Sequence, residues 1–172
     1  MRFIITLGFI AFLSGCADSH QLVRVGEGLS TSLEETDNIY ISIPKDGKYG
    51  DKNYIGSGIS TSQLILIAFS KFSNKVNTGQ KYQSFEKALS HARTNNYNYL
   101  VFPIILEWED RATEWSGIPD RASIKISLIE TESGDSMESA IITGKSGIAT
   151  FGGDHPQDLL ALPVEEYVTT LF

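Results

Sequence analysis

The chain has 172 residues, of which 41% are hydrophobic, and its 14 basic and 21 acidic side chains give a net charge of −7. An acidic balance of this kind argues against nucleic-acid binding and repels acidic lipid headgroups. The single cysteine excludes a disulfide within the chain, so stability has to come from packing.

The first 16 residues have the pattern of a lipoprotein signal. Met1-Arg2 is a short positive region, and residues 3–13 are apolar but too few for a bilayer, which needs roughly 20. The run ends in Leu13-Ser14-Gly15-Cys16, which resembles the bacterial lipobox. This resemblance implies that residues 1–15 are a signal peptide and that Cys16 becomes an N-terminal diacylglyceryl cysteine carrying palmitate. The alternative is an ordinary secretory signal with an incidental cysteine.

The acyl chains on Cys16 would anchor the protein, since each buried CH₂ contributes about 0.8 kcal/mol. Residue 17 is alanine, whereas the lipoprotein sorting rule associates aspartate there with retention at the inner membrane. By resemblance to that rule, we expect the periplasmic leaflet of the outer membrane in preference to the inner membrane.

A polar tether is predicted for residues 16–38, to which residues 21–25 could add a short edge strand. Residues 39–43 are typical of a short buried strand that Pro44 stops. Residues 45–58 form a long loop rich in glycine and lysine. Loops of this length in compact domains are often functional, so an interaction surface is expected here.

Two amphipathic helices follow, with a weak strand at residues 76–82 between them. Ser60 and Gln63 have the spacing of a capping box at the start of the first helix. Its predicted buried stripe consists of Leu64, Ile65, Ala68, Phe69 and Phe72, widened by Leu66 and Ile67. The second helix starts at Ser84, ends at Asn95-Asn96, and buries Phe85, Ala88, Leu89 and Ala92.

A hairpin over residues 97–131 is the element around which the domain is organised. Its first strand, residues 99–108, is almost continuously apolar, as expected of a strand covered on both faces. Its second strand alternates apolar and polar residues over 122–128. A third strand is predicted at residues 137–143. Pro156 then opens a short helix, and Pro163 begins the last one, whose core-facing residues are Val164, Tyr167, Val168 and Leu171.

The predicted order of elements is β-α-β-α-β-β-β-α in a single domain over residues 39–172. Two crossover units and a meander indicate an α/β (α+β) domain with helices packed on a mixed sheet. This topology resembles the small α/β domain shared by the TolB N-terminal region, the curli secretion lipoprotein and the outer-membrane activators of penicillin-binding proteins. A likeness of fold does not carry function.

Three segments resemble a family more closely. They are IPKDGKYGDKNYIGSG at residues 43–58, WEDRATEWSGIPDR at 108–121 and TFGGDHPQDLL at 150–160. They resemble the hallmark segments of a lipoprotein family of Gram-negative bacteria, domain of unknown function 4823. The resemblance covers residues 39–172 and implies no catalytic residue.

The ionic loop of residues 108–121 and the Asp154-His155 pair are the candidate site. The loop carboxylates could be the paired acids of a glycosidase, or Arg111 and Arg121 could neutralise them in a structural or binding loop. Asp154-His155 could be an acid/base pair or metal ligands, or Asp154 could cap the following helix. The candidate residues are Trp108, Glu109, Asp110, Arg111, Glu114, Trp115, Asp120, Arg121, Asp154 and His155. We expect this loop and residues 152–160 to meet at one end of the sheet.

The sequence thus predicts a lipid-anchored periplasmic module that catalyses no reaction, needs no cofactor or metal, and binds an envelope protein. The alternative is a small envelope enzyme or ligand binder that uses the 108–121 loop with Asp154-His155. An enzyme needs a concave pocket with converging carboxylates, whereas a binding module needs an exposed aromatic patch.

Overall fold

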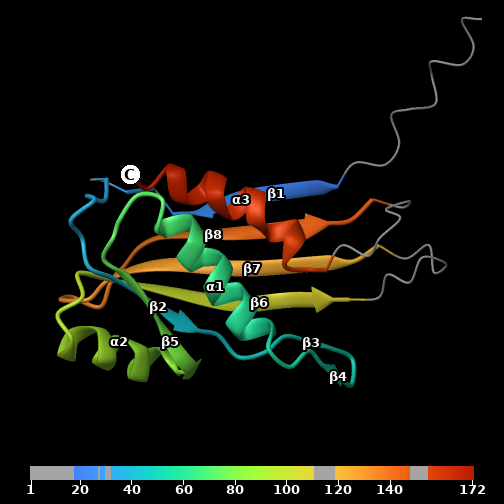
Figure 1. Ribbon diagram of the computed structural model, residues 1–172, viewed down its shortest axis with the longest axis horizontal. Helices are drawn as coiled ribbons and strands as arrows, with labels where there is room; N and C mark the ends of the chain where they lie inside the picture. The colour runs from blue at the N-terminus through green and yellow to red at the C-terminus, as the bar shows by residue number, and fades with distance from the viewer. Residues whose placement is uncertain (1–17, 27, 30–31, 111–118, 148–154) are drawn as a thin grey trace, which may run out of the picture.

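The computed structural model describes residues 18–26, 28–29, 32–110, 119–147 and 155–172. The strands are β1 (Ser19–Val25), β2 (Ile39–Ile43), β3 (Lys48–Tyr49), β4 (Lys52–Asn53), β5 (Val76–Tyr82), β6 (Tyr99–Glu109), β7 (Arg121–Glu130) and β8 (Ser136–Lys145). The helices are α1 (Ser57–Phe69), α2 (Phe85–Thr94) and α3 (Asp158–Thr169). Six strands form one sheet in the order β1-β8-β7-β6-β2-β5, and β3 and β4 form a separate hairpin (Figure 1).

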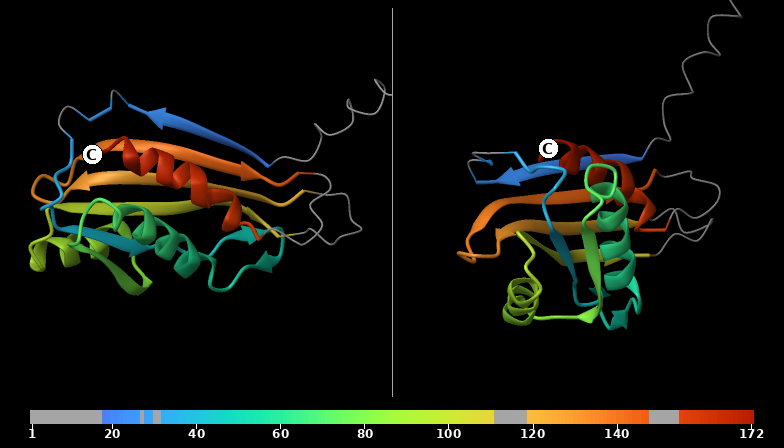
Figure 2. Two further views of the ribbon diagram at one scale, coloured as in Figure 1. Left: turned by 45° about the horizontal axis from the view of Figure 1, so that its top comes forward. Right: turned by 60° about the vertical axis from the view of Figure 1, so that its left-hand side comes forward.

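The sheet is mixed. Strand β2 is parallel to both of its neighbours, β5 and β6, whereas β6, β7, β8 and β1 pair antiparallel. The β2-α1-β5 and β5-α2-β6 crossovers run in opposite directions across the sheet. Crossovers of one hand must then place their helices on opposite faces. Figure 2 shows α1 and α2 on opposite faces, with α3 beside α1. The predicted α/β fold with a mixed sheet is confirmed.

The core has two parts because the helices divide between the faces. The face beneath α1 and α3 carries the larger cluster, which includes Ile41, Phe69, Ile126 and Tyr167. The face beneath α2 carries a smaller one. Its buried members are Tyr40, Ala88, Ala92, Leu100 and Ile129. Because α2 has only 10 residues, it covers only one end of its face.

The apolar run of β6 predicted a strand covered on both faces along its whole length. The structure shows that only part of β6 is covered on both faces. Its midpoint lies beyond α2, and there Ile104 is 41% and Leu106 52% exposed. The prediction was wrong because a continuous apolar run does not reveal how far a covering helix extends.

The predicted tether is wrong for residues 19–25, which form β1, the edge strand that residues 21–25 indicated in part. Strand β1 pairs with β8 from Ser19 opposite Lys145 to Val25 opposite Ser139. The guanidinium of Arg24 donates to the Glu138 carboxylate at 2.8 Å, and this carboxylate is buried. Leu33 is also buried, and its N–H donates to the Leu171 carbonyl. The folded domain thus begins well before residue 39.

Helix α1 begins at Ser57, one turn before the predicted capping box. Gly56 adopts a φ of 92°, a left-handed conformation that favours glycine. The Gly58 N–H donates to the Asp46 carboxylate at 2.8 Å, so a residue from the preceding loop satisfies the helix start. The buried stripe is also narrower than predicted, because Ile67 is 64% exposed while Thr61 is fully buried.

Helix α3 runs through Pro163 instead of starting there. Proline has no N–H, so the Leu159 carbonyl lacks its usual helical donor. This carbonyl lies against Gly144 of β8, where a Cβ atom would come within 2.5 Å of the Leu159 oxygen. Only glycine at position 144 lets the first turns of α3 lie this close to the sheet.

The buried hydroxyl of Tyr167 leads to a testable prediction. Within the described part of the chain this hydroxyl has no hydrogen-bond partner. Burial raises the pKa of Tyr167, and the charge of Glu138 raises it further. Tyr167→Phe is therefore expected to keep or increase stability at pH 8, by up to about 1 kcal/mol, because no bond is lost.

The pH dependence of the same variant follows from the sign of the shift. A folded pKa above the unfolded value of about 10 means that the folded state holds the proton longer, so stability falls as pH rises past 10. Tyr167→Phe should lose less stability than the wild type between pH 8 and pH 11 in urea melts. A variant destabilised by more than about 1 kcal/mol at pH 8 would show that the hydroxyl has a partner.

Candidate functional site

Trp108 lies in the core, although the sequence placed it on a candidate surface. It is 3% exposed and sits beneath Gly47, where a Cβ atom would come within 2.6 Å of the Trp108 Cβ. The loop after β2 therefore covers the indole, and glycine at position 47 permits this approach. Trp108 supports the loop structurally and is not available to a partner.

Glu109 and Asp120 are also buried, at 7% and 1% exposure. Glu109 pairs with Arg121 in the last register position of β6 and β7, so the strands continue to the base of the loop. The Asp120 N–H donates to the Ser146 hydroxyl at 2.8 Å, and its carbonyl accepts from the Ser146 N–H. Both carboxylates are thus buried, whereas the sequence placed them on a candidate binding surface.

Asp110, Arg121 and His155 are the candidates that keep solvent contact. A carboxylate oxygen of Asp110 lies 4.0 Å from Nδ1 of His155, so the two predicted segments meet here. The Asp110 N–H also donates to the Tyr54 hydroxyl at 3.3 Å, which brings in the loop after β4. Both side chains of the Asp110–His155 pair are exposed, so the pair adds little stability.

The remaining candidates, Arg111, Glu114, Trp115 and Asp154, lie outside the described residues. Within the described ranges no carboxylate forms an ion pair with Arg121. Neutralisation of the loop carboxylates by Arg111 stays a prediction, because Arg111 lies outside those ranges. The same part of the chain holds no group of three or more side chains suited to a metal ion. None of its helices is long and apolar enough to cross a membrane.

The 45–58 loop, where the sequence predicted an interaction surface, borders an apolar groove around Tyr82 at the end of β5. The sequence did not predict the contribution of β5 and β6 to this groove. Two adjoining cavities, of about 420 and 510 Å³, share Pro44, Lys45, Asp46, Lys48 and Tyr82. The first cavity continues along β6, and the second continues to Ile55 and Ile59 at the start of α1. We call the two together the Tyr82 groove.

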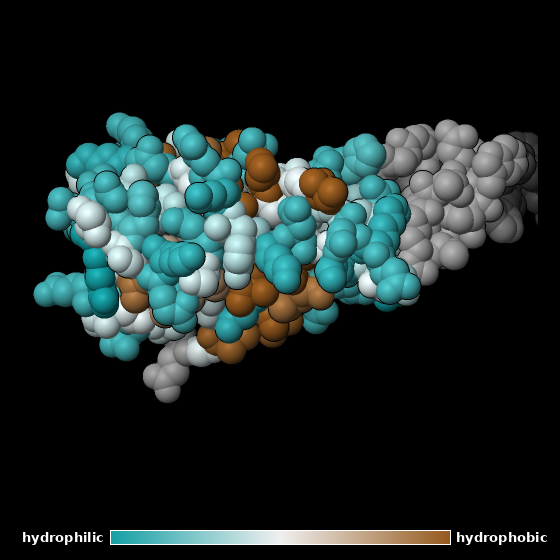
Figure 3. All heavy atoms as spheres, turned by 90° about the horizontal axis from the view of Figure 1, so that it is seen from below, coloured by the Kyte–Doolittle hydropathy of each residue, from teal (hydrophilic) through white to brown (hydrophobic). Residues whose placement is uncertain are grey.

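The Tyr82 groove exposes large apolar side chains to an unusual degree. Ile55 is 91%, Tyr82 55%, Leu106 52% and Ile59 45% exposed. Figure 3 shows apolar side chains gathered on this side of the molecule. Contiguous apolar surface of this kind marks interaction sites. Two features of the sequence could have indicated this groove. They are the unbroken apolar run of β6 and Ile55, which precedes the glycine at the start of α1.

The rim of the Tyr82 groove is positively charged. Lys45, Lys48 and Lys81 line it, and all three are exposed. The one carboxylate in the lining, Asp46, is engaged by the Gly58 N–H. The whole chain has a net charge of −7, so this basic rim is a local exception. Its positive charge, beside the apolar lining, favours a partner segment that is both apolar and acidic.

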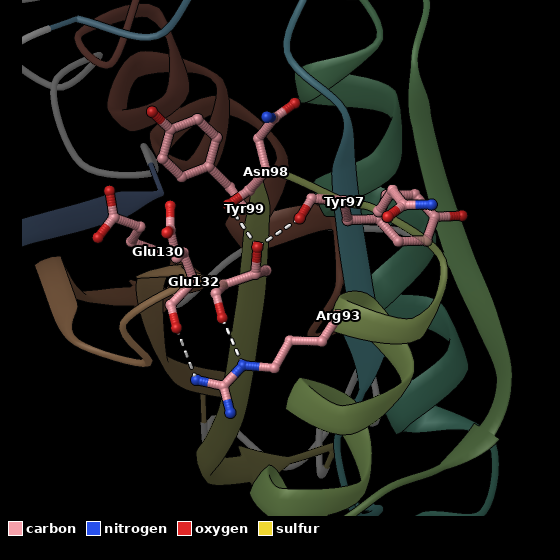
Figure 4. A pocket seen from close by; sticks show the side chains of 8 residues that line it. Arg93, Tyr97, Asn98, Tyr99, Glu130 and Glu132 are labelled. Carbon is pink, nitrogen blue, oxygen red and sulfur yellow. Dashed lines mark hydrogen bonds between the residues drawn. The ribbon is translucent and has the colours of Figure 1, made fainter.

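A further cavity, of about 370 Å³, lies at the other end of the sheet between α2 and the β7–β8 turn (Figure 4). The Arg93 guanidinium in its wall donates to the carbonyls of Thr131 and Glu132, at 2.6 and 3.0 Å. The Thr131 hydroxyl donates to the Asn98 carbonyl. These groups connect α2 to the sheet and are committed to the fold, so this cavity is the weaker candidate.

The same cavity has an acidic border. Burial raises the pKa of Tyr99 in its wall, and the charges of Asp37, Glu130 and Glu34 raise it further. A carboxylate or phosphate ligand would be repelled there. The Tyr82 groove is accordingly the candidate functional site.

Comparison with known families gives one match. The model described as "Domain of unknown function (DUF4823)" matches residues 31–171 of this chain. No curated protein matches it. The matched range starts after β1 and ends within one residue of the last residue of the chain.

Several solved structures share the fold. PelC from Paraburkholderia phytofirmans, solved as a dodecamer, is 16% identical to this chain with a TM-score of 0.65. The match covers 86% of this chain and 96% of PelC. XCC0632 from Xanthomonas campestris is 12% identical with a TM-score of 0.50, over 84% of this chain and 90% of its own. Lipoprotein GNA1162 from Neisseria meningitidis is 12% identical, with a TM-score of 0.49, over 78% of this chain and 96% of its own. The likeness to PelC and XCC0632, at identities this low, shows a common fold and no more.

Proposed function

The chain belongs to the family described as domain of unknown function 4823. We propose that it is a lipid-anchored accessory module of the Gram-negative envelope. It binds a protein partner and catalyses no reaction. The partner-binding surface is the Tyr82 groove.

Anchoring rests on the first 17 residues. The apolar run is followed by Leu13-Ser14-Gly15-Cys16, and Cys16 is the only cysteine in the chain. Acyl chains on this residue supply a membrane affinity that grows by about 0.8 kcal/mol per buried CH₂, so two or three chains hold the protein stably. With Ala17 after the cysteine, we assign the protein to the periplasmic leaflet of the outer membrane.

The observation that carries the binding role is the exposure of Ile55, Tyr82 and Leu106 around one groove. A partner that fully buries one such side chain gains roughly 1.5–3 kcal/mol of hydrophobic free energy. Aromatic and aliphatic side chains in a concave site, with charges at the rim, have the anatomy of a protein interface.

The experiment compares crosslinked partners of three acylated proteins in intact envelopes. The double variant Ile104→Ser, Leu106→Ser removes apolar contact from the groove, and Leu162→Ser makes the same kind of change at a side chain on α3 that is 58% exposed. The yield of the crosslinked partner is expected to fall about tenfold in the double variant, the effect of losing about 1.4 kcal/mol. In Leu162→Ser it should stay at the wild-type level.

Two results of this comparison contradict the groove as the binding surface. One is an unchanged set of adducts in the double variant, and the other is an equal loss in Leu162→Ser. Circular dichroism of the three proteins controls for folding, because all the substituted side chains are exposed and should leave the melt unchanged.

The Asp110–His155 contact favours the alternative of a small enzyme or ligand binder at the 108–121 loop. A carboxylate next to an imidazole can hold and move a proton. Under this alternative, Asp110→Asn would abolish the cellular function while the adducts formed through the groove remain. Under the binding role, Asp110→Asn should be neutral.

A further inference from the structure

The sheet begins almost at the lipid. Ser19, the first residue of β1, is the third residue after Cys16 and pairs with Lys145 of β8. One residue earlier, the Asp18 carboxylate accepts a hydrogen bond from the Gly147 N–H at 3.0 Å. Three residues of fully extended chain span at most about 10 Å. No long tether separates the anchor from the folded domain.

From this connection we infer that the end of the sheet where β1 starts faces the bilayer and contacts its headgroup phosphates. The inference rests on the proposed acylation of Cys16 and adds an orientation to the proposed function. The surface in question consists of the start of β1, the end of β6, the start of β7 and the end of β8, together with His155 before α3.

The strand register brings these segments to one end. Glu109, Arg121, Lys145 and Ser19 occupy successive positions across β6, β7, β8 and β1. In Figure 1 these strand ends lie at the right, and the β3–β4 hairpin lies toward the same side in both Figure 1 and Figure 2. The Asp110–Tyr54 hydrogen bond connects the end of β6 to the residue that follows this hairpin.

Two cations at this end have no protein partner among the described residues. Arg121 and Lys145 are both exposed and stand directly opposite each other in the β7–β8 register. Like charges at opposite positions destabilise a sheet unless an anion lies between them. Phosphate oxygens of lipid headgroups supply that anion, since basic residues near an anionic membrane surface each gain about 1 kcal/mol.

The carboxylates near these cations are engaged elsewhere. Asp18 accepts from Gly147, and Asp110 contacts His155. Glu109 and Asp120 are buried. Burial therefore shields Glu109 and Asp120 from the bilayer, whereas Asp18 and Asp110 stay charged and are held by their contacts with Gly147 and His155.

The turn at the opposite end of the sheet is acidic. The turn between β7 and β8 carries Glu130, Glu132 and Asp135, all exposed. Strand β8 has 10 residues, so this turn lies about 33 Å from Lys145. Anionic headgroups repel such a turn, so the charge distribution and the short connection favour the same orientation.

The test measures how close each end lies to lipid headgroups in the acylated full-length protein. A fluorophore is placed at His155→Cys or at Asp135→Cys, both exposed positions, since acylation blocks the thiol of Cys16. The vesicles contain phosphatidylethanolamine and phosphatidylglycerol with a fraction of headgroup-nitroxide lipid. The label at residue 155 should be quenched at least fivefold more than the label at residue 135. Equal quenching, or stronger quenching at residue 135, overturns the orientation.

Two variants separate the causes. A Gly/Ser linker of 20 residues between Ala17 and Asp18 reaches about 25 Å and should abolish the difference between the labels. A difference that persists with the linker overturns the role of the short connection. Arg121→Glu with Lys145→Glu should reduce quenching at residue 155 at least twofold in anionic vesicles and leave it unchanged in neutral ones. No reduction overturns the headgroup contact.

Mass spectrometry of Cys16 distinguishes failure of the inference from failure of the proposed function. An unmodified Cys16 contradicts the proposed anchor. An acylated, vesicle-bound protein whose two labels are quenched equally contradicts only the orientation.

Discussion

A Phe69→Ala variant is expected to lose about 3–5 kcal/mol of unfolding free energy, the usual cost of replacing a core phenylalanine. Phe69 is fully buried in the larger core cluster, on the last turn of α1. Its ring meets the edge of Phe172, with the centroids 6.2 Å apart. The substitution leaves a cavity between α1 and Phe172. A urea melt followed by circular dichroism measures the loss.

Ile67→Ala provides a matched control on the same helix. Ile67 is 64% exposed, two residues before Phe69. Its truncation removes little buried surface, so the expected change is within about 0.5 kcal/mol. A loss below about 1 kcal/mol for Phe69→Ala, or similar losses for the two variants, would show that the buried face of α1 is assigned incorrectly.

Replacing Cys16 by serine is expected to abolish acylation and to remove the protein from the outer-membrane fraction. Serine has no thiol for the diacylglyceryl group, so the variant should remain as an uncleaved precursor or become soluble. The affinity lost is that of two or three acyl chains, which no surface contact replaces. Fractionation of envelopes and the mass of the N-terminal peptide measure this outcome.

Ala17→Asp is the control for localisation in the same experiment. It keeps Cys16 and the acyl chains but places aspartate where the sorting rule associates it with inner-membrane retention. We expect an acylated protein in the inner-membrane fraction. Outer-membrane fractionation of Cys16→Ser would contradict the lipoprotein assignment, and that of Ala17→Asp would contradict only the sorting rule for this chain.

The pattern of apolar residues predicted most of the elements correctly. The strand at residues 76–82 and the helix that starts after Ser84 agree with β5 and α2. These predictions depended on the periodicity of apolar residues within single segments, and tertiary packing did not alter the secondary structure that this periodicity indicated. The mixed sheet followed from the element order and the right-handedness of crossovers.

Long-range contacts decided the elements that the sequence did not predict. Helix α1 begins at Ser57 because Asp46, 12 residues before the bonded Gly58 N–H, accepts from it. Strand β1 belongs to the sheet because Arg24 pairs with Glu138, 114 positions away. The local pattern of residues 17–38 is polar and gives no sign of the Arg24–Glu138 contact, so a tether was the natural interpretation.

The candidate site shows the same division between local and long-range information. The 108–121 loop was predicted as the site because its charges and tryptophans are close in sequence, yet Trp108, Glu109 and Asp120 are buried. The Tyr82 groove brings together residues from β5, β6 and the loop after β2. No local motif marks such a site, because it exists only once the sheet has formed.

The position of β1 has a mechanical consequence. Under the proposed anchoring and orientation, a partner that draws the domain away from the bilayer would pull along the strands, while the acyl chains on Cys16 would hold the start of β1. The load then falls on the seven register positions between β1 and β8 in shear, so they resist it together instead of opening one after another. The Arg24–Glu138 contact lies near the far end of this joint and reinforces it. Under the proposed anchoring, the edge strand is therefore the element that would transmit force between membrane and domain.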